Sequence, residues 1–180
     1  MSPPGPRFEA FDPEPDSGCG LFLLQADSAD QVDLTQLVGC LGPAPAHFIA
    51  FVALDARGVP DDVISELGAR LIRAGAVCVG TWGPDCERVH DLTDDAYDAA
   101  TMPTEHDVVM TTWHDDESLA DALWFALNTA CPTQSFEETC RAVVAIVINS
   151  LPWAAEVRHA FADPQQFSQD VLSRDDESAV

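Results

Sequence analysis

The sequence contains no lysine, and all eight basic residues among its 180 are arginines. This absence excludes a Schiff-base lysine, a lysine general base and the lysine of a phosphate-binding P-loop. Against these cations stand 31 Asp and Glu residues, which give a formal net charge of -23. Such a charge argues against nucleic acid and anionic membranes as partners, because both are bound through cations that neutralise phosphate. It suits a basic protein partner, a divalent metal or solubility alone.

Several other common patterns are also missing. The longest apolar runs have about eight residues, far short of a membrane span, and residues 1–6 lack the charged and apolar regions of a signal peptide. The six cysteines form no CxxC pair. We therefore expect a cytoplasmic protein with reduced thiols. There is no GxGxxG after the first predicted strand and no GxSxG, so no dinucleotide cofactor is expected and an α/β-hydrolase is disfavoured.

Apolar residues make up 47% of the chain, which is enough to form a folded core. Continuous apolar runs predict buried strands over residues 47–54, 76–82, 108–113 and 142–148. Periodic apolar positions predict helices over residues 60–74, 117–130 and 152–162. This alternation predicts an α/β fold, a three-layer sandwich with a mostly parallel sheet of four to five strands. Residues 84–106 fit either a short helix near residues 93–100 or an acidic loop.

Composition divides the chain into four segments. Five prolines among acidic residues predict a disordered arm over residues 1–18. Residues 19–46 contain two short apolar stretches and end in Gly-Pro-Ala-Pro, which predicts a partly ordered extension with a linker. Residues 47–162 are expected to form the α/β domain, and residues 163–180 a disordered acidic tail.

Polar and aromatic residues follow the ends of three predicted strands. Ligands of open parallel sheets bind beyond these carboxyl ends, so we expect the functional site there. The candidate residues for binding are Asp55, Trp82, Asp85, Trp113, Asp115 and Glu117.

One hypothesis for this edge is a thiol nucleophile. Cys86 follows a Gly-Pro turn, so we expect it to be more exposed than Cys78 in mid-strand. A catalytic cysteine needs a histidine to lower its pKa and a carboxylate to orient that histidine. His114 with Asp91 or Asp55 would supply both. The alternative is an inert, half-buried Cys86 that packs under the loop.

A second hypothesis for the same edge is a metal site. His90, Asp91, His114 and Asp115 have the nitrogen and oxygen ligands that zinc accepts, but their spacing matches no known metal motif. The acidic residues that precede the second helix are better explained as its N-terminal cap. No bound metal is therefore predicted.

Three segments resemble an uncharacterised bacterial family catalogued as a domain of unknown function. They are Trp82 to Cys86 (WGPDC), Met110 to Glu117 (MTTWHDDE) and Leu123 to Phe125 (LWF), and the likeness covers roughly residues 47–150. The resemblance implies no activity. It places Cys86, Asp91 and His114 on matching positions, whereas a Trp in the family pattern near His90 implies that His90 is the poorest candidate ligand.

No complete catalytic signature emerges from the sequence. We therefore expect a small acidic bacterial protein that acts as a protein-interaction or regulatory module, such as an immunity or inhibitor protein that covers a basic partner. The alternative is a cysteine- and histidine-dependent hydrolase or acyl transferase that uses Cys86, His114 and Asp91.

Overall fold

The computed structural model describes residues 6–11, 18–42, 46–100 and 108–178, which form a six-stranded sheet of order β1-β2-β6-β3-β4-β5. The strands are β1 (Arg7–Phe11), β2 (Gly20–Ala26), β3 (His47–Ala53), β4 (Ala76–Trp82), β5 (Met110–His114) and β6 (Cys140–Ile148). β1 is antiparallel to β2, and all other neighbours are parallel. The predicted α/β class with a mostly parallel sheet is confirmed, with one strand more than the predicted maximum.

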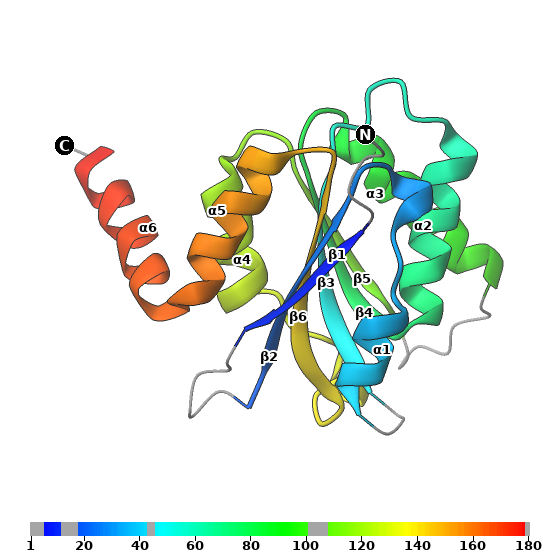
Figure 1. Cartoon of the computed structure of the whole chain (residues 1–180), viewed down its shortest axis with the longest axis horizontal. Coiled ribbons are helices and arrows are strands. Elements are labelled where there is room, and N and C mark those ends of the chain that lie inside the picture. Colours follow the sequence, from blue (N-terminus) through cyan, green and yellow to red (C-terminus); the bar gives the residue numbers. More distant parts are fainter. Residues whose placement is uncertain (1–5, 12–17, 43–45, 101–107, 179–180) are drawn as a thin grey trace.

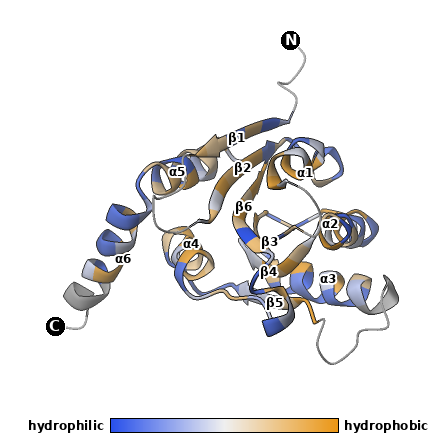
Figure 2. Cartoon of the chain, turned by 90° about the horizontal axis from the view of Figure 1, so that it is seen from below, coloured by the Kyte–Doolittle hydropathy of each residue, from blue (hydrophilic) through white to orange (hydrophobic). Residues whose placement is uncertain are grey.

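Helices cover both faces of the sheet (Figures 1 and 2). One layer contains α1 (Thr35–Leu41), α2 (Asp61–Arg73) and α3 (Cys86–Ala100), and the other contains α4 (Leu119–Asn128) and α5 (Leu151–Ala162). The last helix, α6 (Pro164–Ser178), extends away from α5 at the edge of the molecule. Short 3-10 helices occupy Ala29–Gln31 and Gln134–Phe136.

The pleat of the central strands supplies two separate apolar cores. In β6, Val144 and Ile146 face the layer of α1, α2 and α3, whereas Val143 and Ala145 face α4 and α5. Residues 142–148 are all buried, because β6 lies between β2 and β3 and is covered on both faces. The continuous apolar run that predicted this strand therefore reflects burial on two sides.

The N-terminal segment differs from the predicted disordered arm, because Arg7–Phe11 forms strand β1. Phe8 stacks on Phe22 with 5.6 Å between ring centroids, and Phe11 packs edge-on against Phe161 at the same distance. These two contacts bury one aromatic ring on each face of the sheet and explain why the segment is ordered. Residues 1–5 and 12–17 of the predicted arm lie outside the described part.

The C-terminal segment also differs from the predicted disordered tail, because it forms α6. Phe167 and Val171, one helical turn apart, give this helix an apolar side, and Val171 is almost completely buried. Residues 179–180 are not described.

Two further segments contain more secondary structure than the sequence predicts. Residues 19–46 contain β2, a 3-10 helix and α1, with 43–45 of the linker outside the described residues. For residues 84–106, the sequence left a short helix near 93–100 or an acidic loop as alternatives. The structure has a helix, α3, which begins at Cys86 and is longer than the one considered. Residues 101–107, which include His106, are likewise not described.

Candidate functional site

The carboxyl ends of β3, β4 and β5 lie side by side, as expected for adjacent parallel strands. After β4 the chain enters α3 on one face of the sheet, and after β5 it enters α4 on the opposite face (Figure 2). Ligands of open parallel sheets usually bind beyond the carboxyl ends of the strands. The candidate residues at the ends of β4 and β5 lie where the chain leaves the sheet toward its two faces.

The turn after β4 depends on a glycine. Gly83 has a φ of 115°, and a Cβ atom there would lie 2.5 Å from the Leu54 carbonyl oxygen. This close approach lets the Leu54 amide donate to the Trp82 carbonyl at 3.0 Å and the Ala56 amide donate to the Pro84 carbonyl at 3.0 Å. The loops after β3 and β4 are therefore joined by backbone hydrogen bonds.

Arg88 strengthens this junction from the first turns of α3. Its guanidinium forms ion pairs with Asp85 at 2.7 Å and with Asp61 of α2. It also donates to the carbonyl oxygens of Val59 and Ala56. Because these partners occupy the guanidinium, Arg88 is not available to neutralise the other acidic residues nearby.

Cys86 is buried, which corrects the expectation that it is the more exposed thiol. Its exposed fraction is 1%, compared with 3% for Cys78. The reason is that the Gly-Pro turn leads directly into α3, where Thr81 Oγ1 donates to the Cys86 carbonyl at 3.0 Å. Burial raises the pKa of the Cys86 thiol, and hydrogen bonds with backbone groups, first that of His114, oppose the rise only in part.

His114 takes a different carboxylate from those expected. Its Nδ1 lies 3.0 Å from Glu117 Oε2, and its Nε2 lies 3.2 Å from Thr112 Oγ1. The ring packs against Phe125 of α4, with 4.9 Å between ring centroids, and lies beside Gly80. With an exposed fraction of 6%, His114 has both ring nitrogens within hydrogen-bond distance of protein groups.

Asp91 and His90 belong to a second cluster on the α3 face. His90 Nδ1 lies 3.1 Å from Asp91 Oδ1, and His90 Nε2 lies 3.1 Å from Thr111 Oγ1, which donates to Asp94 at 2.7 Å. The Trp113 ring packs edge-on against His90, with 4.7 Å between centroids. His90, the poorest candidate in the sequence pattern, is thus the histidine that contacts Asp91.

The pleat of β5 separates these two clusters. Thr111 and Trp113 contact His90 of α3, whereas His114 contacts Phe125 of α4 on the other face. Cys86, His114 and Asp91 therefore share one edge of the sheet, but Asp91 is hydrogen-bonded to another histidine. The predicted site lacks Thr111, Thr112 and Asp94. Asp94 could have been found from its i,i+4 spacing to His90, but only if a helix is expected over these residues.

The other predicted residues are placed as follows. Asp55 forms an ion pair with Arg57 of the same loop, at 2.6 Å. Trp82 Nε1 donates to the Glu117 carbonyl at 2.9 Å, and its ring packs edge-on against Trp153. Asp115 is exposed, and across the described ranges no group of three or more His, Cys, Asp or Glu residues is arranged to hold a metal ion.

Comparison with known proteins identifies the domain but no activity. The family model "Domain of unknown function (DUF7684)" matches residues 26–164. The chain belongs to this family. The resemblance to a family of unknown function is thereby confirmed, and the DUF7684 match extends beyond residues 47–150 at both ends. No curated protein matches the chain.

The DUF7684 segment contains α1 to α5 and β3 to β6, whereas β1, most of β2 and nearly all of α6 lie outside it. Both clusters at the ends of β4 and β5 are therefore within the family domain. In the described part of the chain, no helix has the length and apolar character needed to cross a membrane.

Proposed function

We propose that this DUF7684 protein is a protein-interaction module, of an immunity- or inhibitor-like kind, that binds a basic partner. The proposed contact surface, called the acidic edge below, surrounds Trp113 at the ends of β4 and β5. Its exposed carboxylates are Asp85, Glu87, Asp91, Asp115, Asp116 and Glu117.

The observation that supports this proposal most directly is the exposure of Trp113. Its exposed fraction is 44%, and Met110 on the same short strand is 43% exposed. β5 is the last strand of the sheet, and no other described strand pairs with its outer side. Exposed aromatic rings and unpaired strand edges are both common features of protein-binding surfaces.

The charge around Trp113 supports a basic partner. Residues 84–121 contain Arg88 as their only Lys or Arg, and Arg88 is engaged by Asp61 and Asp85. Of the remaining carboxylates, Glu117 contacts His114 and Asp91 contacts His90. The exposed side chains of Glu87, Asp115 and Asp116 can pair with the arginine or lysine side chains of a partner. An indole ring beside carboxylates also suits a guanidinium group, which can stack on the ring while it pairs with the acids.

The competing hypothesis is a hydrolase or acyl transferase that uses Cys86 and His114. It is favoured by the hydrogen bond between the Cys86 thiol and the His114 backbone. However, the thiolate is the nucleophile, and burial raises the pKa of this thiol. The His114 ring is also held by Glu117 and Thr112, so the interaction role fits the geometry better.

The proposal is tested with fluorescein-labelled nona-arginine as the basic probe, measured by fluorescence anisotropy. We expect binding that weakens as salt is added, because ion pairs at an exposed surface are screened. The W113A variant should bind about tenfold more weakly, as expected for a central aromatic contact. Equal affinity of W113A and the unmodified protein would contradict the assignment of this surface.

A matched pair of charge variants separates the acidic edge from the overall charge. D115N/D116N removes two exposed carboxylates next to Trp113, and D27N/D30N removes two exposed carboxylates that follow β2, on the far side of the sheet from β5. Both variants change the net charge equally, so only a localised site distinguishes them. We expect D115N/D116N to lose at least about fivefold in affinity and D27N/D30N less than about twofold. Equal losses would indicate that the probe responds to net charge alone.

A further inference from the structure

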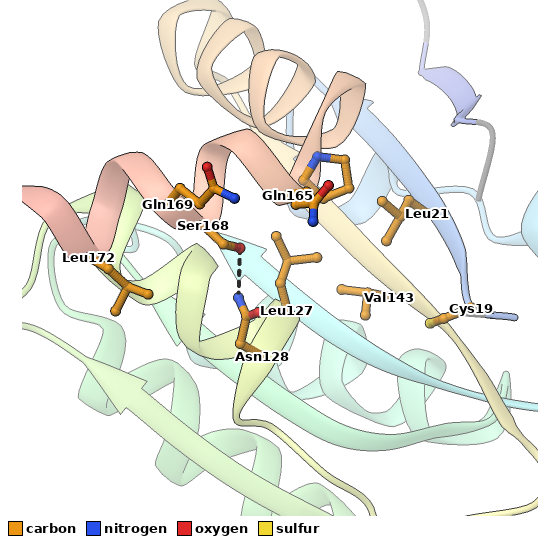
Figure 3. A pocket seen from close by; sticks show the side chains of 10 residues that line it. Cys19, Leu21, Leu127, Asn128, Val143, Gln165, Ser168, Gln169 and Leu172 are labelled. Carbon is orange, nitrogen blue, oxygen red and sulfur yellow. Dashed lines mark hydrogen bonds between the residues drawn. The ribbon is translucent and has the colours of Figure 1, made fainter. Parts of the chain in front are cut away.

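A cavity lies at the opposite end of the sheet from the acidic edge. It opens between α4, α6 and the first residues of β2 and β6, and its volume is about 310 Å³ (Figure 3). This is the lower end of the size range of small-molecule sites, roughly 300–1,000 Å³.

The inner surface of this cavity is apolar. Leu21 of β2 and Val143 of β6 form its base and are 6% and 4% exposed, and Leu127 of α4 lies opposite them (Figure 3). Cys19 completes the base, and burial raises the pKa of its thiol, which keeps the sulfur uncharged near neutral pH. A hydrocarbon chain placed here would replace water at these apolar side chains, which favours binding.

The mouth of the cavity is polar but carries no charge. Asn128 of α4 donates to Ser168 of α6 at 3.1 Å, and Gln165 and Gln169 lie on the same helix (Figure 3). These amide and hydroxyl groups can both donate and accept hydrogen bonds.

None of the ten residues that line the cavity is charged, although Asp, Glu and Arg make up 39 of the 180 residues of the chain. A charged ligand would lose hydration in this cavity without gaining an opposite charge. The lining therefore selects for a neutral molecule.

We propose that this cavity binds an uncharged amphiphile, a compound with a short hydrocarbon chain and a hydroxyl or amide head group. The chain would lie against Leu21, Leu127 and Val143, and the head group would reach Asn128 and the glutamines of α6. This site is independent of the acidic edge, because it lies at the amino ends of the strands and on the face covered by α4.

The test uses 1-octanol and octanoate, which share a chain length but differ in charge, with the full-length protein near pH 7. Isothermal titration calorimetry should show one site for 1-octanol and an affinity for octanoate at least about tenfold lower. Absence of 1-octanol binding, or equal affinities for the two compounds, would overturn the proposal.

Two substitutions locate the binding site. C19F places a large ring in the cavity and should lower the affinity for 1-octanol at least about tenfold. V38F adds the same ring at an exposed position of α1 on the other face and should leave the affinity unchanged. Equal 1-octanol affinity of C19F and the unmodified protein would exclude this cavity.

A measurement on the unmodified protein covers the case in which C19F fails to fold. Bound 1-octanol should slow alkylation of Cys19 at least about threefold without changing that of Cys40, which is exposed on α1. Unchanged alkylation of Cys19 in saturating 1-octanol would also overturn the proposal.

Discussion

Cysteine chemistry in this molecule is governed by burial. Burial is the largest cause that raises the pKa of Cys78, to about 12, and that of Cys140, to about 11. The Cys86 thiol is shifted in the same direction. These thiols are protonated near neutral pH and react slowly, because the thiolate is the nucleophile.

Alkylation by iodoacetamide tests whether the buried thiols react more slowly than the exposed ones. In the native protein near pH 8, the exposed Cys40 and Cys131 should react first, and Cys86 at least about tenfold more slowly. Peptide mass spectrometry at timed intervals gives the rate for each residue, and all six should react alike in concentrated guanidinium. Reaction of Cys86 as fast as Cys40 would instead favour the hydrolase hypothesis.

At the scale of single elements, an ion pair connects β1 to α5. Arg158 of α5 donates to both carboxylate oxygens of Glu9 and to Gln25 of β2. The hydrogen bond with Arg158 is the largest cause of a lowered pKa for Glu9. Both side chains are more than a third exposed, at 39% and 35%, so solvent weakens the pair.

We predict that R158M loses about 0.5–1 kcal/mol of unfolding free energy near pH 7, measured by urea denaturation. Because the pKa of Glu9 is lowered in the folded state, its contribution is complete above the usual value of 4.5. It is lost as the pH falls through the folded pKa, so the two proteins should converge in acid. R57M is the control, since Arg57 pairs with Asp55 of the same exposed loop, and it should behave like the unmodified protein. A difference for R158M that persists in acid would assign its effect to packing.

The elements also show how much could be predicted from the sequence. Strands β3 and β4 were predictable because burial on both faces leaves a continuous apolar run. β1 was not, because its pattern Arg-Phe-Glu-Ala-Phe is short, lies among prolines and becomes stable only against β2. The start of α3 was not predicted, because its many acidic residues give it the composition of a loop.

For the candidate site, the sequence predicted which strand ends come together but not which side chains contact one another. The meeting of Trp82 and His114 follows from parallel neighbouring strands, whose register pairs these two residues. The partners of each histidine do not follow, because they depend on which face of β5 each side chain occupies. Glu117 is near His114 in sequence, whereas His90 reaches Thr111 only because α3 packs beside β5.

At the scale of the whole molecule, the net charge of -23 opposes compaction. We predict that raising sodium chloride from about 0.05 to about 0.5 M stabilises the fold by about 1 kcal/mol, or about 2–4 °C in Tm. Thermal unfolding followed by circular dichroism measures this change. The same salt step near pH 4, where the carboxylates are partly protonated, should have a much smaller effect. No response to salt at pH 7 would indicate that local ion pairs already offset the repulsion.

The central place of β6 sets an order of assembly during synthesis. β6 pairs with β2 on one side and β3 on the other, yet it is the last of the six described strands to leave the ribosome. Until residues 140–148 emerge, the β1-β2 hairpin and the β3-β4-β5 sheet share no hydrogen-bonded ladder. The β1-β2 pair and the β3-β4-β5 sheet can therefore join through β6 only after residues 140–148 have left the ribosome. Chaperones have their longest access to exposed strand edges before that point.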